Sequence, residues 1–449
     1  MDSKRNDVFF RVNHNSFLER VYDFFTNLNF RIDEKEYQRD HTVGEASFSR
    51  KRKLNFKQLV VFLMTLLSKS IQKELNHYYR LMQSGEFELT QISNSAFTQA
   101  RAKLKHTAFV ELSDRVVDEF YNEAPWMSWL GRRVLCIDGS TICLPYHPDL
   151  KEVYGTQKLG SGDREKLMAR ISHLYDPLNK VIVHGTIAEY KKSEMSLCEG
   201  HLDSIQSGDV ILCDRYYASV WLFLVLEKIG ADFVMRLKEK QWTAAKELIQ
   251  DGARERIVEF QADPDHLHLL KKYGVTNRKI KCRLVLVKLE SGEDMVLCTS
   301  MTNEKVYRAD DIAKVYAKRW GIEESYKSLK CRLDLANFSG RTPHAILQDF
   351  HVKIFLSNLC SLVTLEQELK LEKDHEKGGK KLKYRINRTF ALSSFKDLPI
   401  FIFLKRKLKK ALDVFYNLIK KRVSPVRDDR SFPRRTSIKK LSPTNYKPL

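Results

Sequence analysis

The spacing of apolar and polar positions changes along the chain, and each change predicts a different kind of structure. Residues 1–125 carry apolar side chains at helical spacing, as in "FKQLVVFLMTLLSKSIQKELNHYYRLM". From about residue 126 the pattern becomes short apolar runs bounded by turn residues, with helical stretches between them. The order strand, hairpin, helix, strand, helix, strand over residues 126–240 predicts a mixed α/β sheet covered by helices.

The second half of the chain divides into three further regions. Residues 241–302 hold irregular short strands and are interpreted as a β-rich insertion. Residues 303–370 return to helical spacing, with a long helix expected from about Ala309. Residues 371–449 begin with the charged, glycine-containing stretch "EKDHEKGGKKLK", which we interpret as a linker, and continue as a helical, basic C-terminal region.

The helical N-terminal region has two interpretations. Its stretch "SNSAFTQARAKLK" offers Ser93 or Ser95 as a helix cap and places Arg101, Lys103 and Lys105 at outer positions. A helix-turn-helix-like DNA-binding domain fits this pattern. A plain helical bundle with a basic surface fits it as well.

Charge narrows the choice of partner. The 449 residues carry a formal net charge of +21, and this excess predicts a polyanion, most naturally nucleic acid. A basic protein without such a partner is the alternative. No run reaches the ~20 apolar residues that a membrane helix needs, so no membrane is expected. The eight cysteines are scattered singly, which fits a reduced, cytoplasmic location and no structural zinc.

Two apolar runs, "VLCID" and "VILCD", each end in an aspartate, Asp138 and Asp214. Taken alone, each aspartate could start a turn or cap the next helix. Together they suggest a site, because carboxylates at the ends of adjacent strands meet at one edge of an α/β sheet.

The helix expected from Ala309 carries two stripes at about 100° per residue. The apolar stripe should face the sheet and consists of Ile312, Val315, Ile322, Tyr326, Leu329 and Leu333. The adjoining strip consists of Tyr316, Arg319, Glu323, Lys327 and Lys330. Glu323 could reach over the sheet edge toward the two aspartates. Alternatively, the strip is a solvated flank in which Glu323 pairs with Arg319 or Lys327.

Three carboxylates from two strands and a helix form an all-oxygen ligand set suited to Mg²⁺, with Mn²⁺ as a substitute. Two such ions about 3.5–4 Å apart activate a water or a 3′-hydroxyl for displacement at phosphorus. Arg319 and Lys330, on the same helix, could hold the phosphodiester.

The pattern Y-x2-R-x3-E-x6-K, filled by Tyr316, Arg319, Glu323 and Lys330, resembles the signature of insertion-sequence 4 family transposases. "CIDGST" and "LCDRYYAS" resemble the first and second acidic motifs of that family. The likeness extends from "FSRKRKLNF" and "SAFTQARAKLK" to "FSGRTPHAILQDF" and the basic "PVRDDRSFPRR". It therefore covers most of the chain.

The resemblance implies an RNase H-like mixed-sheet catalytic core, interrupted by the β-rich insertion. It implies that Asp138, Asp214 and Glu323 ligate two metal ions. It further implies that three residues of the active site contact the DNA phosphates, namely Tyr316, Arg319 and Lys330. Arg215 is a second-tier candidate for a phosphate contact. Some relatives excise through a DNA hairpin with the help of a wedging side chain. Met295 stands at the comparable position, where it could be a wedge or an ordinary core residue.

The leading hypothesis is a bacterial, cytoplasmic and nucleoid-associated DNA transposase of the cut-and-paste type. It would bind the terminal inverted repeats of its element as a homodimer on double-stranded DNA. It would then cleave with metal ions and join the 3′-hydroxyl ends to target DNA. Two alternatives are a non-catalytic DNA-binding or regulatory protein derived from a transposase, and a nuclease without strand transfer.

Overall fold

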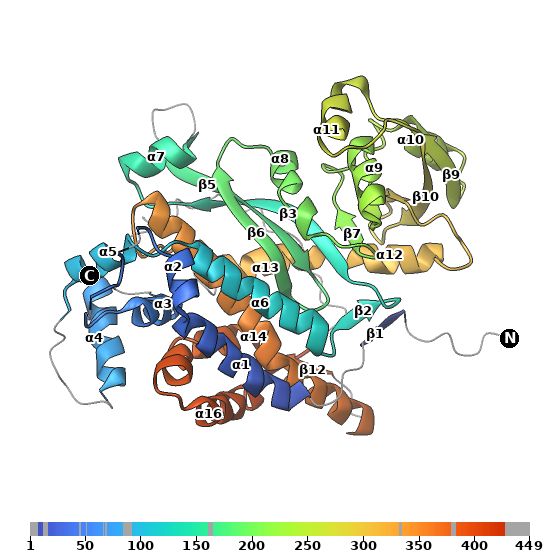
Figure 1. Ribbon diagram of the computed structural model, residues 1–449. Helices are drawn as coiled ribbons and strands as arrows, with labels where there is room; N and C mark the ends of the chain where they lie inside the picture. The colour runs from blue at the N-terminus through green and yellow to red at the C-terminus, as the bar shows by residue number, and fades with distance from the viewer. Residues whose placement is uncertain are drawn as a thin grey trace.

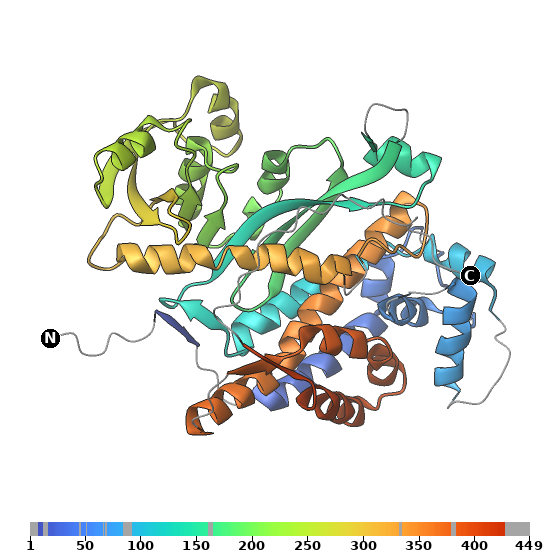
Figure 2. The ribbon, with the colours of Figure 1, turned by 180° about the vertical axis from the view of Figure 1, so that it is seen from behind.

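The computed structural model describes residues 8–11, 17–44, 46–50, 52–65, 67, 70–83, 92–159, 165–331, 335–378 and 383–426. Helices dominate the N-terminal part, which packs beside and below a large sheet (Figures 1 and 2). The N-terminal helices are α1 (Phe17–Asp33), α2 (Lys35–Asp40), α3 (Phe56–Met64), α4 (Ile71–Met82), α5 (Asn94–Arg101) and α6 (Thr107–Glu123). Ser93 caps α5 by accepting the Ala96 amide at 3.2 Å, as one of the two predicted caps.

One nine-stranded mixed sheet forms the centre of the protein. Its main path runs β4–β5–β3–β7–β8–β11–β10–β9, and β6 pairs with the other side of β5. The β3–β7 and β7–β8 pairs are parallel and the remaining pairs are antiparallel. The strands are β3 (Val134–Cys143), β4 (Thr156–Lys158), β5 (Glu165–Asp176), β6 (Val181–Glu189), β7 (Val210–Cys213), β8 (Asp232–Arg236), β9 (Glu255–Phe260), β10 (Ile280–Lys288) and β11 (Asp294–Thr299). The predicted hairpin corresponds to β5 and β6.

The two faces of the sheet enter two different cores because side chains alternate along each strand. On β3, Val134 and Cys136 join the core shared with the N-terminal helices and α14 (Pro343–Gly378). Leu135 and Ile137 join the opposite core instead. That second core is covered by α8 (Glu194–Glu199), α9 (Val220–Ile229), α10 (Thr243–Gln250) and α11 (Leu267–Lys272) (Figure 1).

The region expected to be a β-rich insertion continues the main sheet. Its strands β9, β10 and β11 extend the sheet beyond β8, because β11 pairs antiparallel with β8 over Val234–Arg236. The region also contains the helices α10 and α11, which the sequence pattern did not predict. The two helices cover one face of the added strands and enclose Leu248 and Leu270 in the second core.

The long helix expected from Ala309 is two helices, α12 (Ala309–Ala317) and α13 (Trp320–Cys331). The break lies at residues 318–319, where the amides of Lys318 and Arg319 bond carbonyls three residues back at 3.0 and 2.9 Å. Just after the break α13 packs closely on the β5–β6 turn, since a Cβ on Gly321 would lie 2.9 Å from the Cβ of Pro177. The apolar stripe survives the break, since its described members are at most 5% exposed. Leu333 lies outside the described residues.

The segment predicted to be a linker is partly helical. Helix α14 runs from Pro343 to Gly378 and therefore includes the first residues of "EKDHEKGGKKLK". Beyond it lie β12 (Tyr384–Ile386), α15 (Arg388–Ser394), α16 (Leu408–Lys420) and β13 (Val423–Pro425). From residue 427 on, the basic "PVRDDRSFPRR" segment lies outside the described residues. Among the described helices, none has the length and apolar character needed to span a bilayer.

Candidate active site

The two predicted aspartates lie next to each other on neighbouring parallel strands. The register pairs Val134 with Val210 and ends with Ile137 opposite Cys213. Asp138 and Asp214 are the next residues on the two strands, so both leave the parallel ladder at the same level. Carboxyl ends of parallel strands are where α/β sheets bind ligands.

The expected turn after Asp138 does not exist, because β3 continues without interruption to Cys143. The reason is its other neighbour: β5 pairs with every β3 residue from Cys136 to Cys143, including Asp138 opposite His173. Asp214 does start a turn, and its carboxylate accepts the Tyr216 amide at 2.8 Å. The prediction that the aspartate starts a turn was therefore wrong for Asp138 and correct for Asp214. Forming the turn leaves Asp214 available for a further role.

The carboxyl group of Asp138 lies in a partly buried, acidic environment. Its pKa is raised to about 7, chiefly by burial and also by the carboxylate of Asp214, against the opposing effects of the Gly139 amide and the Arg319 guanidinium. The Gly139 amide donates to Asp138 Oδ1 at 2.9 Å. Two like charges held this close disfavour each other, and an added cation would stabilise both.

Helix α13 lies across the strand that carries Asp138. Its Tyr326 hydroxyl donates to the Asp138 carbonyl at 2.7 Å, and Lys330 Nζ donates to Ser140 Oγ at 2.6 Å. These contacts fix the helix above β3, as the views from both sides also indicate (Figures 1 and 2). Lys330 thus contacts β3 two residues beyond Asp138.

Arg319 stands among the three predicted carboxylates. Its Nη2 lies 3.6 Å from Glu323 Oε1, a loose ion pair one helical turn apart. Burial lowers the pKa of Arg319, but Tyr316, Asp138, Glu323 and Asp214 outweigh that effect and raise it. The Arg319–Glu323 contact is the pairing that the alternative interpretation of this strip predicted. Asp138 and Asp214 also act on the Arg319 charge, so the ion-paired flank and the predicted active-site strip are the same cluster of side chains.

The donor set of this cluster consists of carboxylate oxygens, which is the chemistry that hard divalent cations prefer. Asp138 and Asp214 fit such an ion, since they are adjacent and mutually repulsive. Within the described residues, no group of three or more histidine, cysteine, aspartate or glutamate side chains is arranged to hold a metal. Glu323, which faces Arg319 at 3.6 Å, would have to turn toward the aspartates to act as a third ligand.

The remaining predicted DNA contacts differ in exposure. Arg215 is exposed directly beside Asp214. Tyr316 is only 7% exposed, and burial raises the pKa of its hydroxyl to about 12. Met295 lies on β11 with 8% exposure, as part of the core. The burial of Met295 favours the core interpretation over the wedge.

The basic face predicted for α5 is only partly basic at the surface. Arg101 is 5% exposed and pairs with Asp349 at 2.7 Å, so it is not an outer residue. Lys103 lines a cavity of about 310 Å³ together with Arg50 and Arg52, both exposed. These three cations form no ion pair with any residue in the described part of the chain, and we call them the basic pocket.

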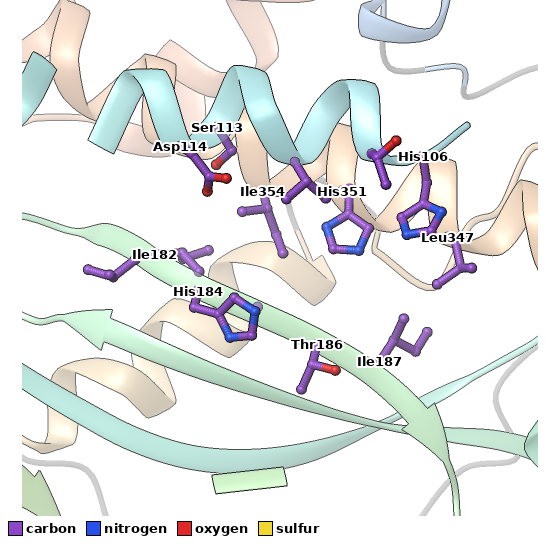
Figure 3. Close-up of a pocket in the computed structure, with 14 residues that line it drawn as sticks. His106, Ser113, Asp114, Ile182, His184, Thr186, Ile187, Leu347, His351 and Ile354 are labelled. Atoms are coloured by element: carbon purple, nitrogen blue, oxygen red, sulfur yellow. The ribbon is translucent and has the colours of Figure 1, made fainter. Parts of the chain in front are cut away.

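A separate cavity of about 340 Å³ lies between β6, α6 and α14 (Figure 3). His106, His184 and His351 project into it with Asp114, and none of the predicted site residues lines it. Burial lowers the pKa of His351 to about 3, so this imidazole is neutral at physiological pH. No sequence pattern predicted this cavity, because the three histidines are far apart in the chain and share no motif.

Comparison with known protein families covers the part of the chain that holds these carboxylates. The family described as "Transposase DDE domain" matches residues 129–359, which is more than half of the chain and includes Asp138, Asp214 and Glu323. The chain therefore belongs to the transposase DDE domain family.

Individual relatives are distant. Over 283 residues the chain is 21% identical to the transposase InsG for insertion sequence element IS4 of Escherichia coli (strain K12), covering 62% of this chain and 63% of InsG. It is 25% identical over 158 residues to the putative transposase InsZ of the same organism, covering 34% of this chain and 52% of InsZ. The match thus spans less than two thirds of either relative.

Among solved structures, the chain is similar to the piggyBac transposase in a synaptic complex with hairpin DNA. The TM-score is 0.44 at 11% identity, covering 94% of this chain and 90% of that one.

Proposed function

We propose that this protein is a DNA transposase that cleaves phosphodiester bonds at the ends of its insertion sequence and joins the freed ends to target DNA. The observation that carries the proposal is the register of β3 and β7, which brings Asp138 and Asp214 side by side at the edge crossed by α13. The order β6–β5–β3–β7–β8, antiparallel and then parallel, supports an RNase H-like core.

In this proposal Asp138, Asp214 and Glu323 hold divalent ions, two Mg²⁺ or Mn²⁺. When bound, such ions activate the attacking oxygen and stabilise the leaving one. Arg319 and Lys330 hold the phosphodiester, since both present cationic groups beside Asp138. For cleavage, a water oxygen attacks phosphorus and the bond to the 3′ oxygen breaks, which leaves a 3′-hydroxyl. For joining, that hydroxyl attacks a target phosphodiester and displaces the target's own 3′ oxygen.

The DNA would be double-stranded, and a homodimer would bring the two element ends together. The basic pocket of Arg50, Arg52 and Lys103, which form no ion pair with other described residues, offers cations for phosphate contact in the proposed N-terminal DNA-binding region. Such a protein would act in the bacterial cytoplasm, at the nucleoid. If the element is excised through a DNA hairpin, the assay described next would detect that hairpin as well.

The test is an assay on duplex DNA that carries the element's own terminal inverted repeats, with Mg²⁺ and a supercoiled target. We expect nicks at the repeat ends and joined products, and a hairpin intermediate would appear as a slowly migrating end in a denaturing gel. Glu323→Gln should lower the cleavage rate by at least a thousandfold, because it removes a ligand, while repeat binding stays within about threefold.

Three outcomes separate the alternatives. Repeat binding without any Mg²⁺-dependent nicking would indicate a non-catalytic DNA-binding protein. Nicking without joining, even from pre-cut 3′-hydroxyl ends, would indicate a nuclease. If Glu323→Gln cuts normally, Glu323 is a structural residue and its role in this proposal is wrong.

A further inference from the structure

Glu194 lies directly against the residue that follows Asp138. It is the first residue of α8, which Ser193 caps by accepting the Ser196 amide at 3.1 Å. A Cβ added at Gly139 would meet Glu194 Cγ at 2.6 Å and Cδ at 2.7 Å. Gly139 does not have a positive φ, so the backbone does not require glycine at this position. The glycine instead leaves space for the Glu194 side chain.

An ion pair holds the Glu194 carboxylate in this place. Arg170 on β5 donates from Nη1 to Glu194 Oε1 at 2.6 Å, and its Nε donates to the Tyr190 carbonyl at 3.2 Å. The arginine is therefore anchored on its other side and fixes the carboxylate. The side chain of Glu194 remains 26% exposed, so solvent reaches it. Among the described residues no donor contacts its second oxygen, Oε2, which can therefore accept a hydrogen bond from a polar ligand.

A buried hydroxyl provides a second, independent indication of a ligand. Tyr217 is fully buried, and its hydroxyl has no hydrogen-bond partner among the described residues. The Tyr217 amide donates to the Asp214 carbonyl at 3.2 Å, so the residue belongs to the turn that follows the second aspartate. Burial raises the pKa of its hydroxyl, and the carboxylates of Glu194 and Asp138 raise it further. Buried polar groups are nearly always paired, which indicates that this corner accepts a further polar group.

We propose that Glu194 is a fourth carboxylate of the active site, and that it accepts hydrogen bonds from the waters of a divalent cation held by Asp138 and Asp214. The proposal rests on the proposed function. Mg²⁺ keeps several of its waters in protein sites, so a carboxylate that binds those waters orients the ion without ligating it. Glu194 is thus a positioning residue, and Arg170 maintains its orientation.

The same helix provides a matched control. Glu199, at the other end of α8, pairs with Lys272 at 2.6 Å, a distance equal to that of the Glu194–Arg170 pair. Glu194→Gln and Glu199→Gln therefore remove the same charge from the same helix and break one ion pair each. Only the first change lies beside Asp138.

The experiment titrates the DNA-free protein with Mn²⁺ and follows free Mn²⁺ by electron paramagnetic resonance. We expect Glu194→Gln to weaken Mn²⁺ binding by about tenfold, as is typical for partners of metal-bound groups, and Glu199→Gln to leave it unchanged. Asp138→Asn serves as the reference for loss of a ligand. In the nicking assay, Glu194→Gln should need about tenfold more Mg²⁺ for half of its maximal rate.

Two results would overturn the proposal. If Asp138→Asn loses Mn²⁺ and Glu194→Gln binds it like the wild type, Glu194 only stabilises the fold. If the wild type neither binds Mn²⁺ nor nicks DNA, the proposed function itself fails and the role of Glu194 with it.

A second pair of variants keeps the test valid if Glu194→Gln folds poorly. Glu194→Ala opens the space over Gly139, so the double variant Glu194→Ala/Gly139→Ala can place its new methyl group there. This double variant should melt close to the wild type and still bind Mn²⁺ about tenfold more weakly. Normal Mn²⁺ affinity in a folded double variant would contradict the proposal.

Discussion

Two charged clusters in this protein use the same side chains, aspartate and arginine, and differ in how completely the charges are paired. We call the first the acidic edge, formed by Asp138, Asp214, Glu323 and Arg319. We call the second the helix junction, where Arg101 of α5 meets Asp349 of α14 with Ser339 and Gln348. At the junction Arg101 donates to Gln348 Oε1 at 2.6 Å, to Ser339 Oγ and Asp349 Oδ1 at 2.7 Å, and to the Ala345 carbonyl at 2.9 Å.

The acidic edge has no such complete pairing. Its one ion pair in the described residues, between Arg319 and Glu323, spans 3.6 Å, and burial together with Asp214 raises the pKa of Asp138 to about 7. Buried charge is tolerated in a fold when it is paired, as at the junction. Charge that remains crowded at the acidic edge costs stability, and such crowding is typical of functional sites. The contrast therefore separates paired charge, which stabilises the fold, from crowded charge of the kind expected at a functional site.

The largest expected effect comes from exchanging one aspartate of each cluster for asparagine. Asp138→Asn should abolish DNA cleavage, with a loss of at least a thousandfold, and leave the melting temperature equal or higher, because it removes a charge that burial disfavours. Asp349→Asn should lower the free energy of unfolding by about 3 kcal/mol, because the Arg101 guanidinium loses its counter-ion in a buried place. Cleavage assays and thermal melts on both variants measure the two effects.

The same two variants can contradict the distinction between the acidic edge and the helix junction. If Asp138→Asn unfolds the protein, the acidic edge is a structural cluster like the junction. If Asp349→Asn is as stable as the wild type, the many hydrogen bonds of Arg101 are sufficient without the charge, and pairing is not what distinguishes the clusters.

The sequence predicted the acidic edge better than the junction, for a physical reason. Asp138 and Asp214 each end a short apolar run, and the parallel pairing of such runs aligns their ends. Arg101 looked like an exposed residue because its helix is short and mostly polar, and its partner Asp349 lies 248 residues away. A long-range partner leaves no trace in local periodicity.

Long-range contacts also explain other differences between the predicted and the observed structure. The residues around 318–319 favour a helix, and the local sequence does not predict the break there, where two amides bond carbonyls three residues back. Glu194 gave no signal either, since a glutamate at a helix start is ordinary. Only its contact with Gly139, which depends on how α8 packs on β3, brings it to the acidic edge.

A third cluster tests whether complete pairing stabilises the fold. Glu111 of α6 accepts from Arg31 at 2.8 Å and from His41 at 2.8 Å. Burial alone would raise the pKa of Glu111, but the bonds from Arg31, His41 and Arg115 outweigh it and lower the pKa to about 2. A carboxyl whose pKa is lowered on folding stabilises the protein above its unfolded value near 4.5, and this contribution is lost as the pH falls toward 2.

Glu111→Gln should therefore destabilise the protein by on the order of 2 kcal/mol at pH 7, and by progressively less between pH 4.5 and pH 2. Urea denaturation at a series of pH values measures this dependence. The matched control is Glu34→Gln, since Glu34 also pairs with Arg31 but is 50% exposed, and it should cost less than about 0.5 kcal/mol. A constant difference between Glu111→Gln and wild type across this range would show that the glutamate acts through packing.

The smallest effect is expected from Arg215, the exposed cation beside Asp214. Because it contributes a charge at the surface and no buried bond, Arg215→Ala should change the unfolding free energy by less than about 0.5 kcal/mol. If the guanidinium contacts one phosphate, repeat binding should weaken a few-fold, and the slope of log affinity against log salt should flatten by about 0.9. Arg278→Ala is the control, since its side chain is 56% exposed, lies outside the proposed DNA-binding region and pairs with Glu227, and it should leave the slope unchanged. Equal slopes for wild type and Arg215→Ala would remove Arg215 from the DNA contacts and confine the functional charge to the acidic edge itself.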